Sequence, residues 1–294
     1  MLYPLLLTQI TKKMIWGRED WITTCRPQEM SIIKNGKFKG ESLESYISKD
    51  KTAVLGEKFA DCVRFPLLIK IIHADDTLSV QVHPDDDYAI KTGGESGKNE
   101  MWQILKPPHD GNLIIGLKPG TTKESFAQAI KKGNDEIENF LNRLQVKTGD
   151  MVNIPAGLVH ALTPGAVILE AQQNSDITYR LYDYGRVGVD GKPRELHTAD
   201  ALNVINFETE GTVTQSVNTE FFKVSGHVVN ARKEEKSNPF GFHILVCTEG
   251  LLNIVCGDES LELSEGNCVF IPAGLGAYEI NPVNGHGVYT KISG

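Results

Sequence analysis

A segment of the chain occurs twice, at 149–161 and again at 266–278, which is 117 residues further along. The first copy reads GDMVNIPAGLVHA and the second reads GNCVFIPAGLGAY. Each copy opens on a glycine followed by Asp or Asn, which is typical of a tight turn, and continues into a short apolar run and a Pro-Ala-Gly bend. A chance match of this length is improbable, so the sequence predicts two related β domains. Other short apolar runs, separated by Gly, Pro, Asn and Asp, also favour a mainly β chain.

The two copies differ at one position that matters for chemistry. His160 in the first copy corresponds to Ala277 in the second. An imidazole is a common metal ligand, whereas a methyl group cannot bind a metal. If the repeated motif places a ligand, we expect the metal site in the N-terminal domain alone.

Three polar side chains share one face of a predicted strand ahead of the repeat. Apolar residues alternate with Ser79, Gln81 and His83, and this period of two places the three polar groups on one side. Burying them without partners costs roughly 1–3 kcal/mol each, and a metal would remove that cost for Gln81 and His83. Glu100 opens a second strand-like run, 100–105, and could direct its carboxylate into the same space. The alternative for His83 is a hydrogen-bonded core or surface histidine.

Gln81, His83, Glu100 and His160 together offer oxygen and nitrogen donors from strands of one domain. This donor set suits a borderline divalent ion such as Zn²⁺, and the absence of nearby cysteine favours a catalytic or ligand-binding site over a closed structural one. The remaining histidines lack such neighbours, and we interpret them as structural or surface residues: His73, His109, His197, His227, His243 and His286.

The charge of the chain argues against several kinds of partner. Its 294 residues carry a formal net charge of −8, and 40% of them are hydrophobic, as in a globular protein. An acidic chain is a poor ligand for nucleic acid or an anionic membrane, so we expect neither as a partner, and nothing in the sequence favours a monomer over a homo-oligomer. The five cysteines include no CxxC pair, no apolar run reaches about 18 residues, and the run 5–7 is too short for a signal-peptide core. We therefore expect a cytoplasmic protein with reduced thiols.

A helical pattern interrupts the β region over 121–144. Thr121 and Glu124 have the spacing of a capping box, and Asn134 would begin a second helix. That second helix would place Ile137, Phe140, Leu141 and Leu144 on one face. We predict an N-terminal metal-binding domain of residues 1–210, which includes this helical segment, and a C-terminal domain of residues 211–294 without metal ligands.

Two residues have competing interpretations. Lys70 interrupts the apolar run 65–72, where a lysine usually extends toward an edge, but it could instead present its ammonium to an anion. Trp16 either packs in the core or a lid, or forms a wall of the active cleft.

The motifs also carry a family resemblance. The Pro-Ala-Gly bend followed by histidine resembles the second metal-binding motif of cupins, which are small jelly-roll barrels, so two copies imply two cupin-like barrels. Five segments carry a second resemblance: 65–70, 78–86, 98–101, 155–161 and 176–183. Taken together, they look like the type I mannose-6-phosphate isomerases in their short bacterial form, and the resemblance runs from about Trp16 to the C-terminus.

The resemblance implies an activity in mannose metabolism and roles for individual residues. Members interconvert mannose 6-phosphate and fructose 6-phosphate, and they hold a single Zn²⁺ per chain through residues that match Gln81, His83, Glu100 and His160. The arginine that matches Arg180 is usually assigned to catalysis, and positions that match Ser79 and Lys70 are implicated in holding the substrate phosphate. Longer members carry a histidine where this chain has Gly97, so a general-base role for that histidine cannot operate here.

This isomerisation moves a proton between C1 and C2 through an enediol. A metal or cation beside the oxygens stabilises the developing enediolate, and a positioned base moves the proton. A guanidinium does not deprotonate near neutral pH, so we assign charge stabilisation and positioning to Arg180, with a salt bridge at the barrel rim as the alternative. Lys98, Glu170 and a metal-bound water are the candidates for the base, and Glu170 is equally well explained as a buried partner of Arg180.

Two other classes of protein fit part of this pattern. His83, Glu100 and His160 also form the two-histidine, one-carboxylate set of metal-dependent dioxygenases. Gln81 as a fourth ligand and the candidate phosphate-binding cations weigh against that class. The second alternative is a non-catalytic sugar-phosphate-binding cupin, and the retention of the ligand set in one repeat alone favours an enzyme over it.

Overall fold

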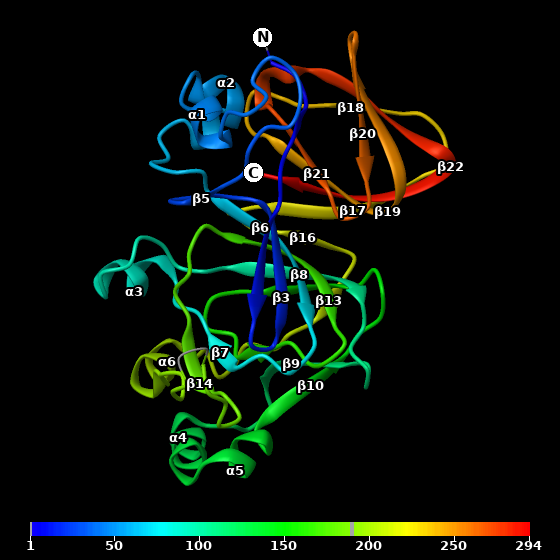
Figure 1. Cartoon of the computed structure of the whole chain (residues 1–294). Helices are drawn as coiled ribbons and strands as arrows, with labels where there is room; N and C mark the ends of the chain where they lie inside the picture. The colour runs from blue at the N-terminus through cyan, green and yellow to red at the C-terminus, as the bar shows by residue number, and fades with distance from the viewer. Residues whose placement is uncertain (1, 189–190) are drawn as a thin grey trace. The chain divides into compact units, whose positions relative to one another are not determined.

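The structure, a computed structural model, describes residues 2–188 and 191–294 and divides into two compact units (Figure 1). The first unit comprises residues 1–11, 20–71 and 215–294, and the second comprises 12–19 and 72–214. These units differ from the predicted continuous domains, because 20–71 groups with the C-terminal segment. Within the described residues, no helix is both long enough and apolar enough to cross a membrane. Three strands run across the division: β2 (Ile10–Met14), β3 (Gly17–Thr23) and β6 (Leu67–Ala74).

The first unit is built on one curled antiparallel sheet in the order β1-β21-β19-β22-β17-β16, with β18 beside β22 and β20 beside β19 (Figure 1). Its longest strands, β19 and β22, pair along most of their length, and apolar side chains such as Leu252 and Tyr289 fill the core. Its elements are β1 (Leu5–Leu6), β4 (Cys25–Arg26), β5 (Glu29–Met30), α1 (Leu43–Ile47), α2 (Lys51–Leu55), β16 (Ser216–Asn218), β17 (Lys223–Val229), β18 (Lys233–Lys236), β19 (His243–Cys256), β20 (Glu259–Ser264), β21 (Cys268–Ile271) and β22 (Ala277–Ser293).

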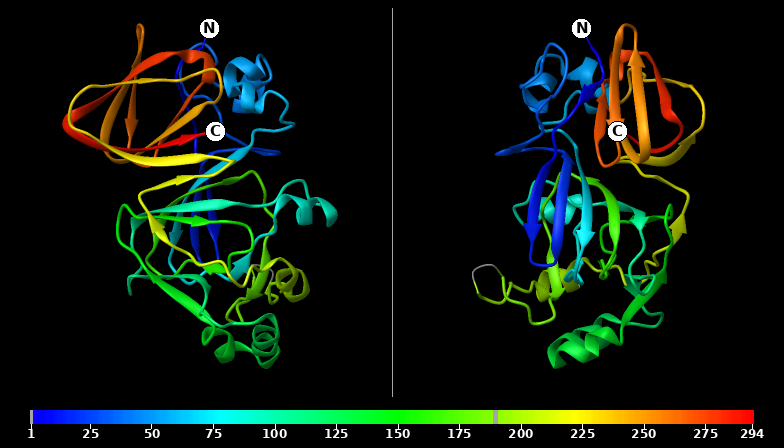
Figure 2. Two further views of the ribbon diagram at one scale, coloured as in Figure 1. Left: turned by 180° about the vertical axis from the view of Figure 1, so that it is seen from behind. Right: turned by 45° about the vertical axis from the view of Figure 1, so that its right-hand side comes forward.

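The second unit contains two sheets. One has the order β10-β9-β12-β7-β14, and the other runs β15-β11-β8-β13 and continues through β6, β3 and β2. The helices α4 and α5 lie together beside β10 in both views of Figure 2. The elements are β7 (Val80–Val82), α3 (Asp86–Lys91), β8 (Glu100–Lys106), β9 (Asn112–Leu117), α4 (Lys123–Lys132), α5 (Asn134–Glu138), β10 (Leu141–Gln145), β11 (Met151–Ile154), β12 (His160–Ala161), β13 (Val167–Gln173), β14 (Tyr179–Tyr182), α6 (Thr198–Val204) and β15 (Val213–Thr214).

The sequence repeat is also a structural repeat. In the second unit β11 leads through the Pro-Ala-Gly bend to β12, which begins at His160, and in the first unit β21 leads through the same bend to β22, which begins at Ala277. The two differing residues therefore occupy the same position, the first residue of the strand that follows the bend. His160 is buried, whereas Ala277 is exposed.

The helical prediction for 121–144 is partly wrong. The capping box is formed by Thr122 and Ser125, one residue beyond the predicted pair. The second helix is short and ends at Glu138, and Leu141 and Leu144 belong instead to β10. Strand pairing explains the difference, because β10 aligns with β9 and places Leu144 opposite Leu113 in the core. Tertiary pairing overrides a local helical spacing here.

The glycine of the first Pro-Ala-Gly bend yields a stability prediction. Gly157 has φ +86°, and an added Cβ would lie 2.9 Å from the carbonyl oxygen of Val204. Gly149 has φ +90°, and an added Cβ would meet no described atom within 4 Å. Both alanine variants carry the left-handed backbone cost of roughly 1–2 kcal/mol. We expect Gly157→Ala to lose roughly 1–3 kcal/mol more than Gly149→Ala in denaturant unfolding, because only Gly157→Ala is overpacked. Equal losses would contradict the close contact.

Candidate metal centre

Three neighbouring strands of the second unit present polar side chains on one face. Gln81 on β7 lies directly opposite His160 on β12 and directly opposite Arg180 on β14. Residues directly opposite in antiparallel strands direct their side chains to the same side of the sheet. The predicted alternation of the β7 segment therefore places Gln81 in one row with His160 and Arg180.

The other sheet of this unit supplies the carboxylates. Glu100 on β8 lies opposite Gln172 on β13, and Trp102 lies opposite Glu170. Because these positions alternate by two along each strand, all four side chains share one face. Trp102 Nε1 donates a hydrogen bond of 2.9 Å to Glu170 Oε2, and the Trp102 ring lies edge-on to the His160 ring, with centroids 5.3 Å apart. This face of β8 and β13 is thus turned toward His160.

His83, Glu100 and His160 converge in a fully buried group. Glu100 Oε2 lies 3.5 Å from His83 Nε2, and Glu100 Oε1 lies 3.3 Å from His160 Nε2. One ligand atom from each residue lies within 4.8 Å of the others. Gln81 Nε2 lies 3.3 Å from His160 Nε2, so the fourth predicted ligand reaches the same place. A divalent ion is commonly held by two imidazoles and a carboxylate.

Both imidazoles are oriented by backbone carbonyls. His83 Nδ1 lies 2.8 Å from the carbonyl oxygen of Ile177, and His160 Nδ1 lies 2.9 Å from that of Leu158. A carbonyl oxygen only accepts, so each Nδ1 carries the hydrogen and each Nε2 keeps a lone pair directed at Glu100. Burial lowers the pKa of His160 to about 3, and the charge of Lys98 acts in the same direction. His160 is therefore neutral, as a metal ligand must be.

Lys98 contributes a positive charge to the same point. Its Nζ lies 2.9 Å from His83 Nε2 and also donates to Glu100 Oε2. Because the Lys98 ammonium contacts both His83 Nε2 and Glu100 Oε2, these two potential metal-ligand atoms point to a common position. The chemistry of the donor set, the convergence of its atoms and the outer hydrogen bonds to both histidines fit a bound divalent metal.

The residues predicted to bind substrate lie in different places. Ser79 is buried on the Gln81 face, with Oγ 3.5 Å from Gln81 Oε1. Trp16 packs in the apolar core of the second unit with Leu78 and Trp102, which corresponds to the packing interpretation. Lys70 belongs to the first unit, where its Nζ lies 5.4 Å from the centroid of the Trp21 ring, so its role with phosphate stays a prediction.

Arg180 is half-buried on the metal face of β14. Its backbone N–H donates to His197 Nδ1 at 3.2 Å, and among the described residues its side-chain Nε has no hydrogen-bond partner. Burial lowers the pKa of Arg180, as does the charge of Arg194, whereas Asp183 acts in the opposite direction. A guanidinium remains charged after such a shift, so Arg180 brings a positive charge and an available donor to this face.

Several residues around the site were not found from the sequence. Asp183 is held by Arg186 and Arg194 in a compact ion-pair cluster beyond the end of β14. Trp102 and Gln172 belong to the face of Glu100. The sequence did contain a signal for Gln172. It lies two positions after Glu170 in the apolar run of β13, and strand alternation places two such residues on one side.

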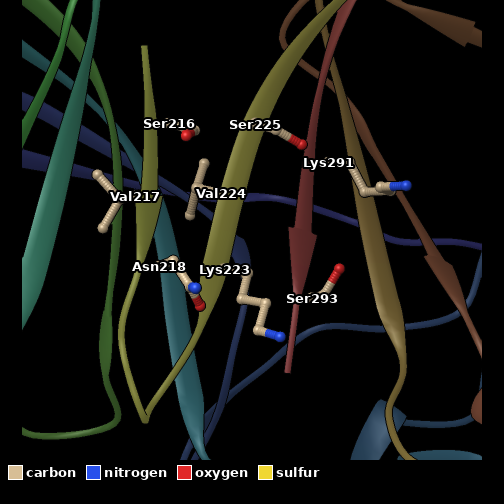
Figure 3. A pocket seen from close by; sticks show the side chains of 8 residues that line it. All are labelled: Ser216, Val217, Asn218, Lys223, Val224, Ser225, Lys291 and Ser293. Atoms are coloured by element: carbon tan, nitrogen blue, oxygen red, sulfur yellow. The ribbon is translucent and has the colours of Figure 1, made fainter. Parts of the chain in front are cut away.

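A pocket in the first unit has a different character. Figure 3 shows its lining on the neighbouring strands β16, β17 and β22, with Lys223, Lys291 and several hydroxyl side chains. Lys291 Nζ is paired with Glu235 Oε2 at 3.0 Å. The residues that line this pocket include no histidine or carboxylate, so its chemistry does not suit a transition metal.

Two family models and several known proteins match this chain. The model of the type I phosphomannose isomerase catalytic domain matches residues 8–128, and the model of the mannose-6-phosphate isomerase cupin domain matches residues 212–288. The mannose-6-phosphate isomerase ManA of Bacillus subtilis is 34% identical over 94% of this chain and 95% of its own. The mannose-6-phosphate isomerase of Streptococcus mutans is 29% identical over 96% of each chain.

Solved structures of related proteins have the same fold as this chain. The crystal structure of mannose 6-phosphate isomerase from Bacillus subtilis has a TM-score of 0.88, is 30% identical and covers 99% of both chains. A putative mannosephosphate isomerase from Archaeoglobus fulgidus, 20% identical, covers 99% of this chain and 97% of its own, and its TM-score of 0.83 shows a shared fold.

The fold and the buried histidine–carboxylate group define a mainly β cupin protein with a candidate metal centre, which confirms the predicted fold class. The chain belongs to the type I mannose-6-phosphate isomerase family. That membership confirms the resemblance and implies a metal cofactor, for which this centre is the candidate site.

Removing one ligand tests the centre. We expect His160→Ala to lose nearly all bound divalent metal, because the imidazole that faces Glu100 and Gln81 is gone. His243→Ala is the matched control, since His243 is also buried but lies in the first unit, where its Nδ1 lies 2.9 Å from Tyr278 OH. Elemental analysis after dialysis against Zn²⁺ gives the metal content. Metal retained in His160→Ala, or lost in His243→Ala, would contradict this centre.

Proposed function

We propose that the chain is a metal-dependent aldose–ketose isomerase that interconverts mannose 6-phosphate and fructose 6-phosphate. The observation that carries this proposal is the buried group of His83, Glu100 and His160 with Lys98 at its side, in a chain of this family. Protein cations at that point suit a reaction in which negative charge develops on two neighbouring sugar oxygens. The substrate is a small sugar phosphate, and the acidic chain argues against nucleic acid and anionic membranes as partners.

We assign one Zn²⁺ per chain to Gln81, His83, Glu100 and His160. When bound, the ion supplies Lewis-acid stabilisation of the developing enediolate. Its two imidazole ligands are oriented by the carbonyls of Leu158 and Ile177, and the neutral state of His160 favours binding. The second repeat carries Ala277 where His160 stands, which supports a single site. The protein acts in the cytoplasm, as expected for an enzyme of sugar-phosphate metabolism with reduced thiols.

Side chains around the metal site carry out proton transfer, charge stabilisation and substrate binding. Lys98 and Glu170 are the side chains that can move the proton between C1 and C2, and both are buried. Lys98 lies among the metal ligands, whereas Trp102 holds Glu170 through its indole N–H. Arg180 stabilises negative charge on the substrate, and Ser79 contacts the sugar phosphate from the Gln81 face.

A coupled assay tests the activity and its dependence on metal together. We expect conversion of mannose 6-phosphate to fructose 6-phosphate to disappear after treatment with a chelator and to return with one equivalent of Zn²⁺ per chain. Full activity in thoroughly chelated protein would contradict the metal-dependent mechanism. Turnover that requires iron and molecular oxygen would instead favour the dioxygenase alternative.

Substitution of Arg180 tests its role in the transition state. If the guanidinium stabilises the enediolate, we expect Arg180→Ala to lower kcat by about 10²–10³ with normal metal content. Arg180→Lys should recover only part of that loss, because lysine keeps the charge but not the planar fork of donors. Arg232→Ala is the control, since Arg232 is an exposed arginine paired with Glu234 and Glu279 in the first unit. An Arg180→Ala variant with near-normal kcat and raised KM would assign Arg180 to ground-state binding instead.

A further inference from the structure

Gln172 has a buried acceptor atom that the protein does not satisfy. The side chain is 0% exposed, and its Nε2 donates to the carbonyl oxygens of Gln173 at 2.8 Å and Ser175 at 2.7 Å. Because both of these partners can only accept, they fix the orientation of the amide with its nitrogen toward the 173–175 turn. The remaining atom, Oε1, has no hydrogen-bond partner among residues 2–188 and 191–294. Buried carbonyl oxygens are rarely left in this state, so the atom requires an explanation.

The position of Gln172 connects this acceptor with the metal centre. Gln172 on β13 lies directly opposite Glu100 on β8 in antiparallel register, so the two side chains are neighbours on one face. On the same face, Glu170 is bonded to Trp102, whose ring contacts that of His160. The amide thus lies on the face that presents Glu100 to the histidines.

We propose that Gln172 Oε1 accepts a hydrogen bond from a hydroxyl of the sugar phosphate bound at the metal centre, a proposal that rests on the proposed function. A neutral amide oxygen beside the anionic Glu100 needs a donor. The phosphate dianion offers only acceptors, whereas the sugar carries hydroxyl donors along its chain. Gln172 is then a specificity residue, because a site that accepts a hydrogen bond from a substrate hydroxyl discriminates against analogues that lack it.

A structural role is the competing explanation. The Nε2 of Gln172 also ties together the 173–175 turn, and the carbonyl of nearby Ile177 orients His83. Gln172→Met removes both the donor and the acceptor at nearly constant length. If the amide acted only through the turn, Gln172→Met would weaken inorganic phosphate or metal as much as a polyol phosphate, so a comparison of these ligands separates the two roles.

Gln173 offers a matched control. It is the next residue along β13, it is also buried, and strand alternation directs it to the opposite face. Its Oε1 already accepts from Asn99, with bonds of 2.9 Å from the backbone N–H and 2.8 Å from Nδ2. Gln173→Met therefore removes a satisfied amide of the same size.

The experiment measures binding to Zn²⁺-loaded protein by titration calorimetry. The probes are mannitol 1-phosphate, a polyol phosphate without a carbonyl that cannot be isomerised, and inorganic phosphate. We expect Gln172→Met to bind the polyol phosphate about tenfold more weakly, as follows from loss of one buried hydrogen bond, with unchanged metal content and unchanged affinity for inorganic phosphate. Gln173→Met should bind like wild type.

Three results would overturn the inference. Unchanged polyol-phosphate affinity in Gln172→Met would show that Oε1 meets no sugar hydroxyl. Equal weakening of polyol phosphate and inorganic phosphate in Gln172→Met would assign the effect to the amide donor and the turn. Loss of metal in Gln172→Met with retention in Gln173→Met would show that the Gln172 amide supports the metal centre and not the sugar.

Two further checks keep the outcome unambiguous. If thermal denaturation shows that Gln172→Met does not fold, the wild-type protein decides with deoxy analogues of the polyol phosphate: a tenfold loss for an analogue that lacks one hydroxyl supports the acceptor role, and equal affinity for all of them contradicts it. Turnover of mannose 6-phosphate by the wild-type preparation tests the proposed function separately. An inactive wild type would contradict the isomerase proposal, whereas an active wild type with an unaffected Gln172→Met would contradict this inference alone.

Discussion

The buried carboxylate of Glu100 is the interaction on which the rest of the second unit depends. It is 0% exposed and lies within 3.5 Å of His83 Nε2 and 3.3 Å of His160 Nε2. Burying a carboxylate costs several kcal/mol unless a positive charge compensates it. Lys98 supplies one such charge, and a divalent ion held by the same atoms supplies a stronger one. Because Glu100 lies on one sheet and His160 on the other, this electrostatic requirement joins the two sheets of the unit.

Backbone groups around the site orient the two imidazoles. Leu158 lies in the Pro-Ala-Gly segment and Ile177 in the segment between β13 and β14, and their carbonyls hold the two Nδ1 atoms. Gly157 donates its N–H to the carbonyl of His83 at 2.9 Å, so the bend that precedes His160 also fixes the backbone at His83, directly after β7. Hydrogen bonds of this kind set the tautomer and ring position that a metal requires. The repeated bend in the first unit also connects two strands, β21 and β22, but carries Ala277 instead of the ligand, which fits a structural role there.

Local patterns in the sequence accounted for much of this arrangement. Period-two alternation placed Ser79, Gln81 and His83 on one face, and comparison of the repeats singled out His160 against Ala277. The pairing of Glu100 with Gln172 was beyond such reasoning, because register between distant strands is not encoded in either strand alone. The same limit applies to Leu141 and Leu144, because pairing with the distant strand β9 places them in a strand and not in a helix. The grouping of 20–71 with the C-terminal segment likewise depends on long-range contacts.

X-ray absorption at the zinc edge, on protein loaded with one equivalent of Zn²⁺, tests the central claim most directly. All five cysteines lie in the first unit, so they provide a built-in distinction between the two halves of the chain. The account predicts nitrogen and oxygen ligands alone, at about 2.0–2.2 Å, with the multiple-scattering signature of imidazole. A sulfur shell at about 2.3 Å, or the absence of imidazole, would contradict a metal centre formed by His83, Glu100 and His160.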